Sequence, residues 1–370
     1  MLASLHSPMA NGEVQPYISP DAVHASLKRM TFGEGQRGQD NPLDHLFLVE
    51  RMVEARDAPA GATLREIAVA RLLSRMIRRH LDDYCHLLNL SPSPRRSDLA
   101  AATHDLQRLG IVDHAALKHW ALLYYRFVRA ELELDPPQIC GLLNVDPRTI
   151  RRYQRAAIHR LTVALTKAEW RVRRKARHRR LIAALPGETG ACLFGRDAQV
   201  EMAESWLSAA PQKLLVSGSL GVGKTRFVRA LVERQIERDD VEGVLWLDAP
   251  ATTETVYLHL REHAALRGVL DFDLREHLLD GRITVVVDGI RALLDDLQAL
   301  DSLLCELEAA HVILIADRYV LIPSVTATLT LEPLEWDYTL ALATHWWQQL
   351  QGDPAISSTE LEALAHASHG

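Results

Sequence analysis

The sequence has few cysteines and no long apolar run. Its 370 residues include four cysteines, none at a spacing that would form a zinc site or a redox dithiol. No stretch approaches the ~20 apolar residues that a membrane helix needs, and the N-terminus lacks the basic and apolar regions of a secretory signal. The 17 histidines form no H-E-x-x-H pattern, and no G-x-S-x-G elbow marks a nucleophilic serine. We therefore expect a cytoplasmic protein without a hydrolase site of these two types.

Charge is distributed unevenly along the chain. The net charge is -6, but residues 148–180 hold thirteen Lys and Arg against one acidic residue, Glu169. Such segregation indicates a polyanionic partner, because a concentrated positive charge attracts phosphates. The content of hydrophobic residues, 48%, is that of an ordinary globular protein, and the length predicts two or three domains.

The first half of the chain predicts helices only. Residues 1–40 show no periodicity, and we interpret them as a mobile leader. From Asn41, an N-cap followed by Pro42, apolar residues recur at helical spacing. Three further helical patterns cover 63–90, 98–109 and 113–132. Residues 41–131 are therefore predicted to form an all-α region.

The second half alternates apolar runs with segments of helix length. Four runs predict strands, namely Leu214–Val216, Val244–Leu247, Ile283–Val287 and Val312–Ile315. Continuous apolar strands separated by helices indicate a parallel sheet that helices cover on both faces. The predicted fold is therefore an α/β domain over residues 191–330, preceded by the all-α region.

A glycine-rich segment follows the first predicted strand. It reads GSLGVGKT and satisfies the G-x-x-x-x-G-K-[ST] pattern. In such a loop, glycines let backbone N–H groups surround phosphates, Lys224 reaches the outer phosphates, and the Thr225 hydroxyl binds magnesium. We therefore expect an α/β P-loop NTPase fold, with ATP or ADP and Mg²⁺ as cofactors. The loop residues expected at the nucleotide are Gly218, Gly221, Val222, Gly223, Lys224, Thr225 and Arg226.

Two further strands are predicted to end in polar residues. The run RITVVVDGI places Asp288 at the carboxyl end of a strand, where ligands bind in parallel sheets, and we expect Asp288 and Thr225 to hold Mg²⁺. The run HVILIADR places Asp317 and Arg318 at the end of the next strand. Arginine donates several fixed hydrogen bonds to phosphate, so Arg318 could distinguish ATP from ADP. Asp288 and Arg318 are the catalytic candidates.

These motifs and their order resemble the ATPase module of the STAND class, which is related to NB-ARC and NACHT domains. The resemblance begins near Leu193 and covers roughly half the chain. It implies that Phe194, Gly195 and Arg196 contact the nucleotide on its base side. It also implies a helical lid over residues 331–370, with Pro333 at the nucleotide. Modules of this class act as switches between a closed monomer with ADP and an open, self-associating form with ATP.

The sequence departs from that family in two places. The magnesium aspartate is usually followed by a further acidic residue that orients the attacking water, whereas residues 289–292 read GIRA. Because water positioning supplies much of the rate of phosphoryl transfer, we expect a slow ATPase or a switch that mainly binds nucleotide. The sequence also stops at Gly370, where the family usually continues, so we expect an incomplete lid and a sensor domain or sensor protein elsewhere.

Residues 132–165 predict a helix-turn-helix. A short helix from Pro137 to Leu143, a turn and a second helix from Pro147, capped by Asp146, reproduce that plan. The segment resembles the DNA-binding end of sigma-like factors and response regulators. Arginine reads guanine edges and also holds phosphates. The residues expected to contact DNA are Arg148, Thr149, Arg151, Arg152 and Arg155. Residues 166–190 are predicted to follow as a basic linker helix that adds backbone contacts.

Three functions remain open from the sequence. The first is an ATP/ADP-dependent switch of STAND type that couples nucleotide state and self-association to DNA binding. The second is an AAA+-like ATPase that remodels DNA or acts in transposition. The third is an ATP switch whose N-terminal module binds protein, as an effector or adaptor does. DNA affinity that weakens with salt separates the third from the others, because phosphate contacts release counterions.

Overall fold

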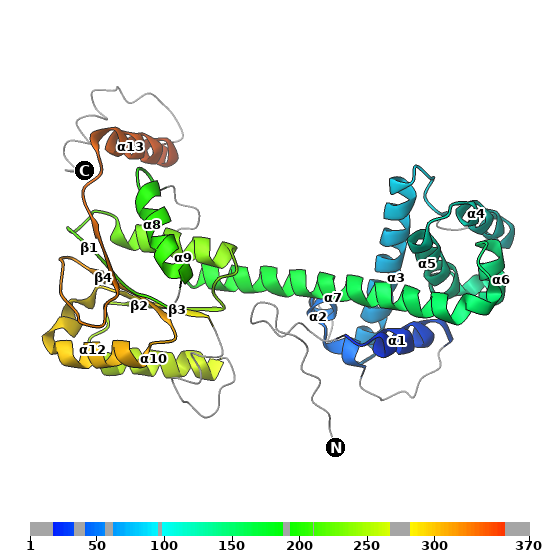
Figure 1. The fold of residues 1–370 in the computed structure, drawn as a ribbon, viewed down its shortest axis with the longest axis horizontal. Helices are drawn as coiled ribbons and strands as arrows, with labels where there is room; N and C mark the ends of the chain where they lie inside the picture. The colour runs from blue at the N-terminus through cyan, green and yellow to red at the C-terminus, as the bar shows by residue number, and fades with distance from the viewer. Residues whose placement is uncertain are drawn as a thin grey trace, which may run out of the picture. The chain divides into compact units, whose positions relative to one another are not determined.

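The computed structural model describes residues 18–32, 41–55, 62–94, 98–187, 193–209, 211–266 and 282–351. The chain divides into two compact units, Met1–Lys175 (unit 1) and Ala176–Gly370 (unit 2). Unit 1 is helical, and unit 2 is built on a sheet (Figure 1). Within the described residues, no helix is long and apolar enough to cross a membrane.

Unit 1 consists of helices throughout its described residues, as the sequence predicts. Helix α5 lies at its centre and is buried from Ala116 to Leu123, because the sequence AALKHWALL is apolar on nearly every side. The α-helices are α1 (Pro20–Phe32), α2 (Phe47–Glu54), α3 (Ala62–Leu87), α4 (Leu99–Ile111), α5 (Ala115–Leu123), α6 (Pro136–Leu142) and the start of α7 (Ile150–Ala183). Short helical turns are η1 (Pro42–His45), the π-helix η2 (Tyr124–Val128), η3 (Ala130–Leu132) and η4 (Pro147–Thr149).

Helix α1 corrects the prediction of a mobile leader over residues 1–40. Val23 and Leu27 lie one turn apart on one face of this helix and are fully buried in the core of unit 1. The Ser19 hydroxyl accepts the N–H of Ala22 at 3.1 Å and caps the first turn. One short helix flanked by polar residues carries too few apolar positions for its periodicity to stand out. Residues 1–17 and 33–40 lie outside the described residues.

The single acidic residue of the basic run has a structural role. Glu169 is fully buried, and its carboxylate accepts the N–H groups of Phe47 at 2.7 Å and Leu48 at 3.0 Å. It thereby satisfies first-turn donors of α2, whose own N-cap residue makes no side-chain hydrogen bond. Asn41 caps the preceding turn as predicted, but extended backbone at Leu46 divides the predicted helix into η1 and α2.

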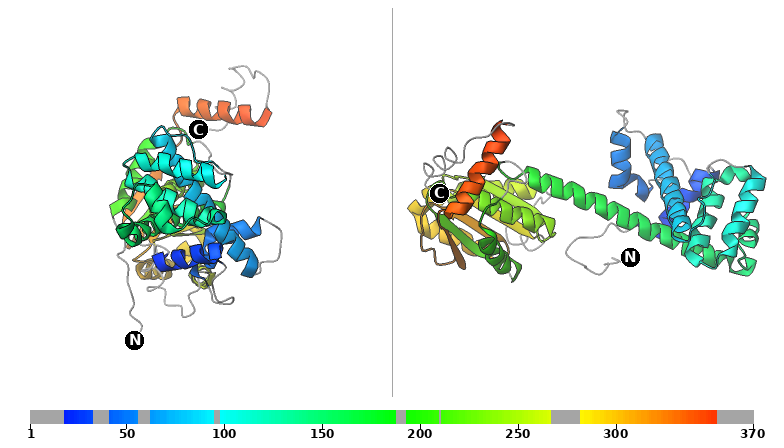
Figure 2. Two further views of the ribbon diagram at one scale, coloured as in Figure 1. Left: turned by 90° about the vertical axis from the view of Figure 1, so that its right-hand side faces the viewer. Right: turned by 90° about the horizontal axis from the view of Figure 1, so that it is seen from above.

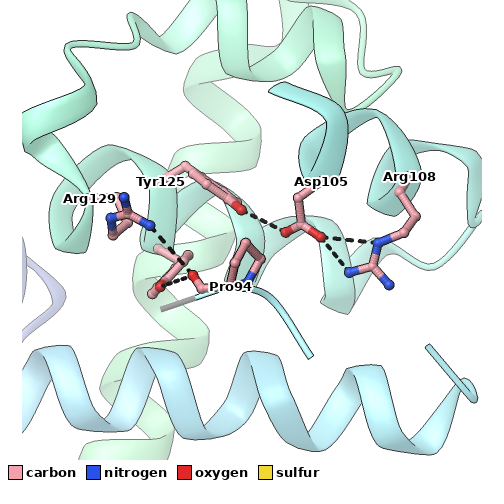
Figure 3. Close-up of polar contacts among 6 residues, drawn as sticks. Pro94, Asp105, Arg108, Tyr125 and Arg129 are labelled. Atoms are coloured by element: carbon pink, nitrogen blue, oxygen red, sulfur yellow. Dashed lines mark hydrogen bonds and ion pairs between the residues drawn. The ribbon is translucent and has the colours of Figure 1, made fainter. Parts of the chain in front are cut away.

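A buried polar network joins α4 to η2 (Figure 3). The Tyr125 hydroxyl donates to Asp105 Oδ2 at 2.6 Å, and Arg108 Nε donates to Asp105 Oδ1 at 3.0 Å. Burial raises the pKa of Tyr125, and the hydrogen bond to Asp105 adds to that shift. The network holds α4, whose Gly110 lies so close to α6 that a Cβ there would clash with the Leu142 carbonyl oxygen. It therefore also helps to position α6.

A neutral histidine makes the stability of unit 1 depend on pH. Arg160 Nε donates to His119 Nδ1 at 3.0 Å, and burial together with the charge of Arg160 lowers the pKa of His119 to about 4. The unfolded chain takes up this proton first, so stability is lost as pH falls from 6.5 towards 4. We expect a loss of about 2 kcal/mol by pH 5, measured by urea denaturation at pH 7.5 and 5.

The control for this prediction is His119→Gln, whose amide oxygen can still accept from Arg160. Contributions from the other histidines cancel when the two chains are compared at both pH values. The variant is expected to lose less stability on acidification than the unmodified chain. An equal loss in both chains would show that His119 is not the titrating group.

Unit 2 contains a five-stranded parallel sheet in the order β2-β3-β4-β1-β5. The strands are β1 (Lys213–Gly218), β2 (Gly243–Asp248), β3 (Ile283–Asp288), β4 (His311–Ala316) and β5 (Ala327–Leu331). The first four are confirmed predictions, whereas β5 is not predicted, because this edge strand alternates exposed and buried residues. The connections from β1 to β2 and from β4 to β5 run in opposite directions across the sheet. Such a reversal is where open parallel sheets bind ligands, beyond the carboxyl ends of the strands.

Helices cover both faces of this sheet (Figures 1 and 2). On one face, α8 (Asp197–Ala209) and α9 (Lys224–Glu237) pack against alternate strand residues such as Val216 and Ile313. On the other face, α10 (Thr253–Leu266) and α12 (Leu297–Glu306) pack against residues such as Val285 and Leu314. The elements that complete unit 2 are η5 (Ile290–Asp296) and α13 (Trp336–Gln351). The α/β class predicted for this half is therefore confirmed.

Helix α7 differs from its prediction. The second helix of the helix-turn-helix and the basic linker helix form one uninterrupted helix, Ile150–Ala183, rather than two segments that meet at residue 165. The boundary between the units falls within this helix, after Lys175, and not near residue 190. Its last turns belong to unit 2, because Arg177 and His178 bind Asp239 at 3.0 and 2.6 Å. Sequence patterns alone do not reveal such tertiary contacts.

Candidate functional site

The loop between β1 and α9 depends on three glycines. Gly221 and Gly223 have φ values of 83° and 91°, in the left-handed region that other residues rarely adopt. A Cβ at Gly218 would stand 2.5 Å from the Leu331 carbonyl oxygen, so β5 excludes a side chain there. Gly223 directly precedes α9, so the loop lies at the N-terminus of a helix, where N–H groups and the helix dipole attract anions.

Lys224 is buried at the first position of α9 and reaches back to the loop. Its Nζ donates to the carbonyl oxygens of Gly218 and Ser219, both at 2.9 Å. The same Nζ lies 3.1 Å from Oδ1 of Asp317, an exposed residue directly after β4. The ammonium group is therefore held at the carboxyl edge of the sheet by three oxygen atoms that an anionic ligand could replace.

Thr225 and Asp288 are in direct contact. The Thr225 hydroxyl donates to Asp288 Oδ2 at 2.8 Å, so the structure brings together the two residues predicted to bind magnesium. Asp248 at the end of β2 lies beside Asp288 in the register of the sheet. Burial raises the pKa of Asp288, and the negative charges of Asp248 and Asp317 act in the same direction, whereas Thr225 and Lys224 oppose them. A cation bound here would reduce the electrostatic repulsion between these carboxylates.

The donors present fit a magnesium ion by their chemistry. Mg²⁺ prefers oxygen ligands, keeps several waters, and in phosphate sites takes one or two carboxylates. Among the described residues, no group of three or more His, Cys, Asp or Glu side chains is arranged to hold a metal ion. Thr225 and Asp288 would therefore share the ion with water and with a bound phosphate.

Asp248 is a site residue that the sequence analysis did not identify. It ends the apolar run VLWLD in the way that Asp288 ends VVVD, and the two strands are neighbours in the sheet. The same rule that selects Asp288, an acidic residue at the carboxyl end of a strand, therefore selects Asp248 as well. Strand order, which the sequence does not give, is what places the two carboxylates side by side.

Two of the expected base-side residues, Phe194 and Gly195, and the expected loop residue Arg226 contact α13. The Phe194 and His345 rings lie 5.6 Å apart between centroids, and the Arg226 guanidinium lies 5.5 Å from the centroid of the Trp346 ring. Gly195 has a φ of 60°, and a Cβ there would clash with the ring of Tyr338. These three positions therefore tie α13 to the segment that precedes α8 and to the first turn of α9.

The remaining expected nucleotide-site residues take different positions. Arg196 is buried and donates to the Glu332 carbonyl oxygen, and burial lowers the pKa of its guanidinium. Val222 is also buried, beneath the loop. Arg318 and Pro333 are exposed and, in the part of unit 2 that the structure describes, join none of the contacts around Lys224 and Asp288. The structure therefore assembles the loop, Thr225 and Asp288, but not Arg318 or Pro333.

In unit 1, a short helix, a turn and a long helix occupy the predicted helix-turn-helix segment. Asp135 and Gln138 form a capping box at the start of α6. The turn contains Asn144 with φ 54°, and the Asp146 carboxylate accepts the N–H of Arg148 at 2.9 Å, as a cap should. Of the expected DNA contacts, Arg148, Arg151, Arg152 and Arg155 are exposed, whereas Thr149 is half-buried and donates its hydroxyl to the Asp146 carbonyl oxygen.

The four exposed arginines share one side of the chain because of helical geometry. Arg151 and Arg152 follow Arg148 by three and four residues and precede Arg155 by four and three, so each arginine lies about one helical turn from another. Ala157, Ile158 and Leu161 of α7 are buried in the core of unit 1. The core contacts therefore fix the orientation of the helix and leave its arginines open to solvent.

Two solved structures resemble part of this chain at low sequence identity and low TM-score. No family model and no curated protein matches the chain. A chain of the E. coli MS115-1 HORMA:CdnC:Trip13 complex is 15% identical with a TM-score of 0.34, and the match covers 47% of this chain and 72% of that chain. Rhizobiales Trip13 is 18% identical with a TM-score of 0.28, covering 53% of this chain and 72% of that chain. Similarity at these TM-scores does not indicate a function for this chain.

Proposed function

We propose that the chain is an ATP/ADP-dependent switch of STAND type that couples its nucleotide state to DNA binding. The proposal that the chain binds nucleotide rests on the group of residues at the carboxyl ends of the strands. A glycine loop at a helix N-terminus, a buried lysine and a Thr–Asp pair are the groups that a magnesium-bound polyphosphate requires. In this proposal the fold of unit 2 is that of a P-loop NTPase.

The proposed role of each residue follows from its present contacts. Lys224 would exchange the carbonyls of Gly218 and Ser219 and the carboxylate of Asp317 for phosphate oxygens. Thr225 and Asp288 would open their 2.8 Å hydrogen bond to hold Mg²⁺, which supplies positive charge to the phosphates. Since residues 289–292 read GIRA and offer no carboxylate to orient water, hydrolysis would be slow.

Helix α13 is the element proposed to respond to the nucleotide. Arg226 follows the magnesium-binding Thr225 directly and contacts Trp346 on α13, while Gly195 contacts Tyr338 on the same helix. A nucleotide that moves either residue therefore changes the contacts of α13. A ligand shifts such an equilibrium only through contacts that differ between the states. In the proposal, ADP favours contact with α13 and a monomer, and ATP favours release of α13 and self-association.

The DNA part of the proposal rests on the exposed arginines of α7 and its preceding turn. Arg148, Arg151, Arg152 and Arg155 are exposed, and the core contacts of Ala157, Ile158 and Leu161 anchor the helix that presents them. A helix presented in this way fits the major groove, where arginine reads guanine and holds the backbone. The proposal assigns Thr149 to the cap of the helix rather than to DNA, because its hydroxyl is bonded to Asp146.

A protein-binding N-terminal module is the second candidate function. It is favoured by intramolecular ion pairs that engage some cations of the basic run. Arg173 pairs with Glu169 at 2.6 Å, and Arg177 pairs with Asp239 at 3.0 Å. Cations that stabilise the fold contribute less to a nucleic-acid surface. Under this alternative, nucleotide binding is unchanged and duplex DNA does not bind.

The Asp288→Asn variant tests the magnesium site. The amide keeps the shape of the side chain but removes the charge that attracts Mg²⁺, so we expect the magnesium-dependent gain in ADP affinity to fall by about tenfold or more. Isothermal titration with ADP in Mg²⁺ and in EDTA measures that gain. Asp295→Asn, an exposed aspartate of η5, is the matched control and should behave as the unmodified chain. A full magnesium effect in Asp288→Asn would rule out this metal site.

A further inference from the structure

Unit 1 contains a cavity of about 730 Å³ between α3, α5 and α7. Its size falls within the range of small-molecule sites, which span roughly 300–1,000 Å³. One wall is the side of α7 that carries Arg160, Lys167 and Arg171, three residues spaced by whole turns of the helix. The facing wall is α3, which contributes Arg79 and Asp83. The cavity lies entirely within unit 1 and is separate from the glycine loop of unit 2.

The charge of this cavity is strongly positive. Among the described residues, four of the side chains that line it are cations from two facing helices, and Asp83 is the one carboxylate. The α7 cations Arg160, Lys167 and Arg171 are exposed, so they are available to a ligand in solution. Facing cations repel one another in the absence of an anion, and this repulsion is relieved when an anion binds between them. Charge complementarity therefore selects an anionic ligand.

The floor of the cavity is aromatic and holds one of the cations in place. Trp120 is buried there and stacks on His80, with ring centroids 4.5 Å apart and an interplanar angle of 16°. His119 beside it accepts the Nε proton of Arg160 at 3.0 Å. That bond engages one edge of the Arg160 guanidinium and leaves its two Nη groups for other acceptors. The arginine is thereby oriented before a ligand arrives, which lowers the entropic cost of binding.

We propose that this cavity is a binding site for a small phosphorylated ligand. Guanidinium groups match phosphate with paired hydrogen bonds, and a lysine adds a point charge, so Arg79, Arg160, Arg171 and Lys167 supply the donors that a phosphate group uses. The aromatic floor can support an uncharged part of the same molecule. Phosphate could also come from the DNA backbone, but a concave site of this volume suits a small molecule rather than an extended duplex.

The test measures binding of inorganic pyrophosphate to the full chain by isothermal titration. The Lys224→Ala background removes the lysine of the glycine loop, so that the signal reports unit 1. In this background we expect binding of one pyrophosphate. Adding Lys167→Ala and Arg171→Ala should weaken the affinity by about 100-fold, since two charged donors are lost from one wall. Neither residue contributes a buried contact to the core, so the variant is expected to keep its circular dichroism spectrum and thermal midpoint.

The matched control is Lys175→Ala, an exposed lysine one turn beyond Arg171 that does not line the cavity. It should bind pyrophosphate as tightly as the background. The proposal is overturned if the background does not bind pyrophosphate, or if Lys167→Ala with Arg171→Ala binds it unchanged. It is also overturned if these two substitutions weaken duplex DNA binding but leave pyrophosphate binding intact, because the cations would then serve the DNA backbone. None of these outcomes depends on whether the glycine loop binds nucleotide.

Discussion

Lys224→Ala is expected to weaken ATP and ADP binding by about 100-fold or more. The ammonium group is buried at the N-terminus of α9 and is held by two loop carbonyls and Asp317. In the bound state it would neutralise phosphate charge at short range, and hydrogen bonds between charged groups contribute about 1.5–3 kcal/mol each. Isothermal titration with ADP and with a non-hydrolysable ATP analogue, each in Mg²⁺, measures the change.

Lys213→Ala is the control for the loss of a lysine in this unit. Lys213 is the first residue of β1 and Gly218 is the last, so Lys213 lies at the end of the strand that is farther from the loop. Its removal should leave nucleotide affinity unchanged. Circular dichroism and thermal unfolding establish that both variants remain folded. Unchanged affinity in folded Lys224→Ala would remove the site assignment altogether.

Replacing Arg151, Arg152 and Arg155 together with alanine is expected to reduce duplex DNA affinity by about 100-fold or more at low salt. All three are exposed on α7, and other residues of that helix anchor it in the core, so their loss should not disturb the core. Each phosphate contact contributes about 0.9 to the slope of log affinity against log salt, so three lost contacts should reduce that slope by about 2–3. Fluorescence anisotropy with a labelled duplex at several salt concentrations measures both quantities.

A matched triple variant distinguishes a DNA surface from general charge attraction. Arg51, Arg71 and Arg75 are exposed arginines of α2 and α3 in the same unit. Their replacement removes the same charge from unit 1 but should change DNA affinity and its salt slope far less. Equal effects of the two triple variants would indicate that DNA is attracted by net charge alone. No DNA binding by the unmodified chain would favour the protein-binding alternative.

The parts of the fold that the sequence predicts are those with strong local signals. Buried parallel strands appear as continuous apolar runs, and four of the five strands are found in this way. The turn at Asp146 and the N-cap at Asn41 are predicted because a side chain and its backbone partner lie within a few residues. Strand β5 is missed because it shows only a short alternation of apolar and polar residues, and helix α1 is missed because it carries too few apolar positions for its periodicity to stand out.

The parts of the site that sequence patterns miss depend on contacts between distant segments. Asp317 is recognised as a strand-end residue, but its ion pair with Lys224 joins positions that no local pattern connects. Asp248 reaches Asp288 only because β2 and β3 are neighbours in the sheet. In the sequence, Glu169 is an isolated acid in a basic run, and its role in holding the start of α2 is visible only in the tertiary fold. The chemistry of a local motif can thus be predicted from the sequence, whereas contacts between distant segments cannot.

The same anisotropy titration, carried out on the unmodified chain in different nucleotide states, tests the central claim most directly. DNA affinity is measured with Mg-ADP, with a non-hydrolysable ATP analogue and without nucleotide, each at low and moderate salt. A nucleotide-controlled DNA switch predicts binding that weakens with salt and differs between ADP and the ATP analogue. The coupling would be contradicted if the chain binds both nucleotides but does not bind DNA. It would also be contradicted if the DNA affinity is identical in all three nucleotide states.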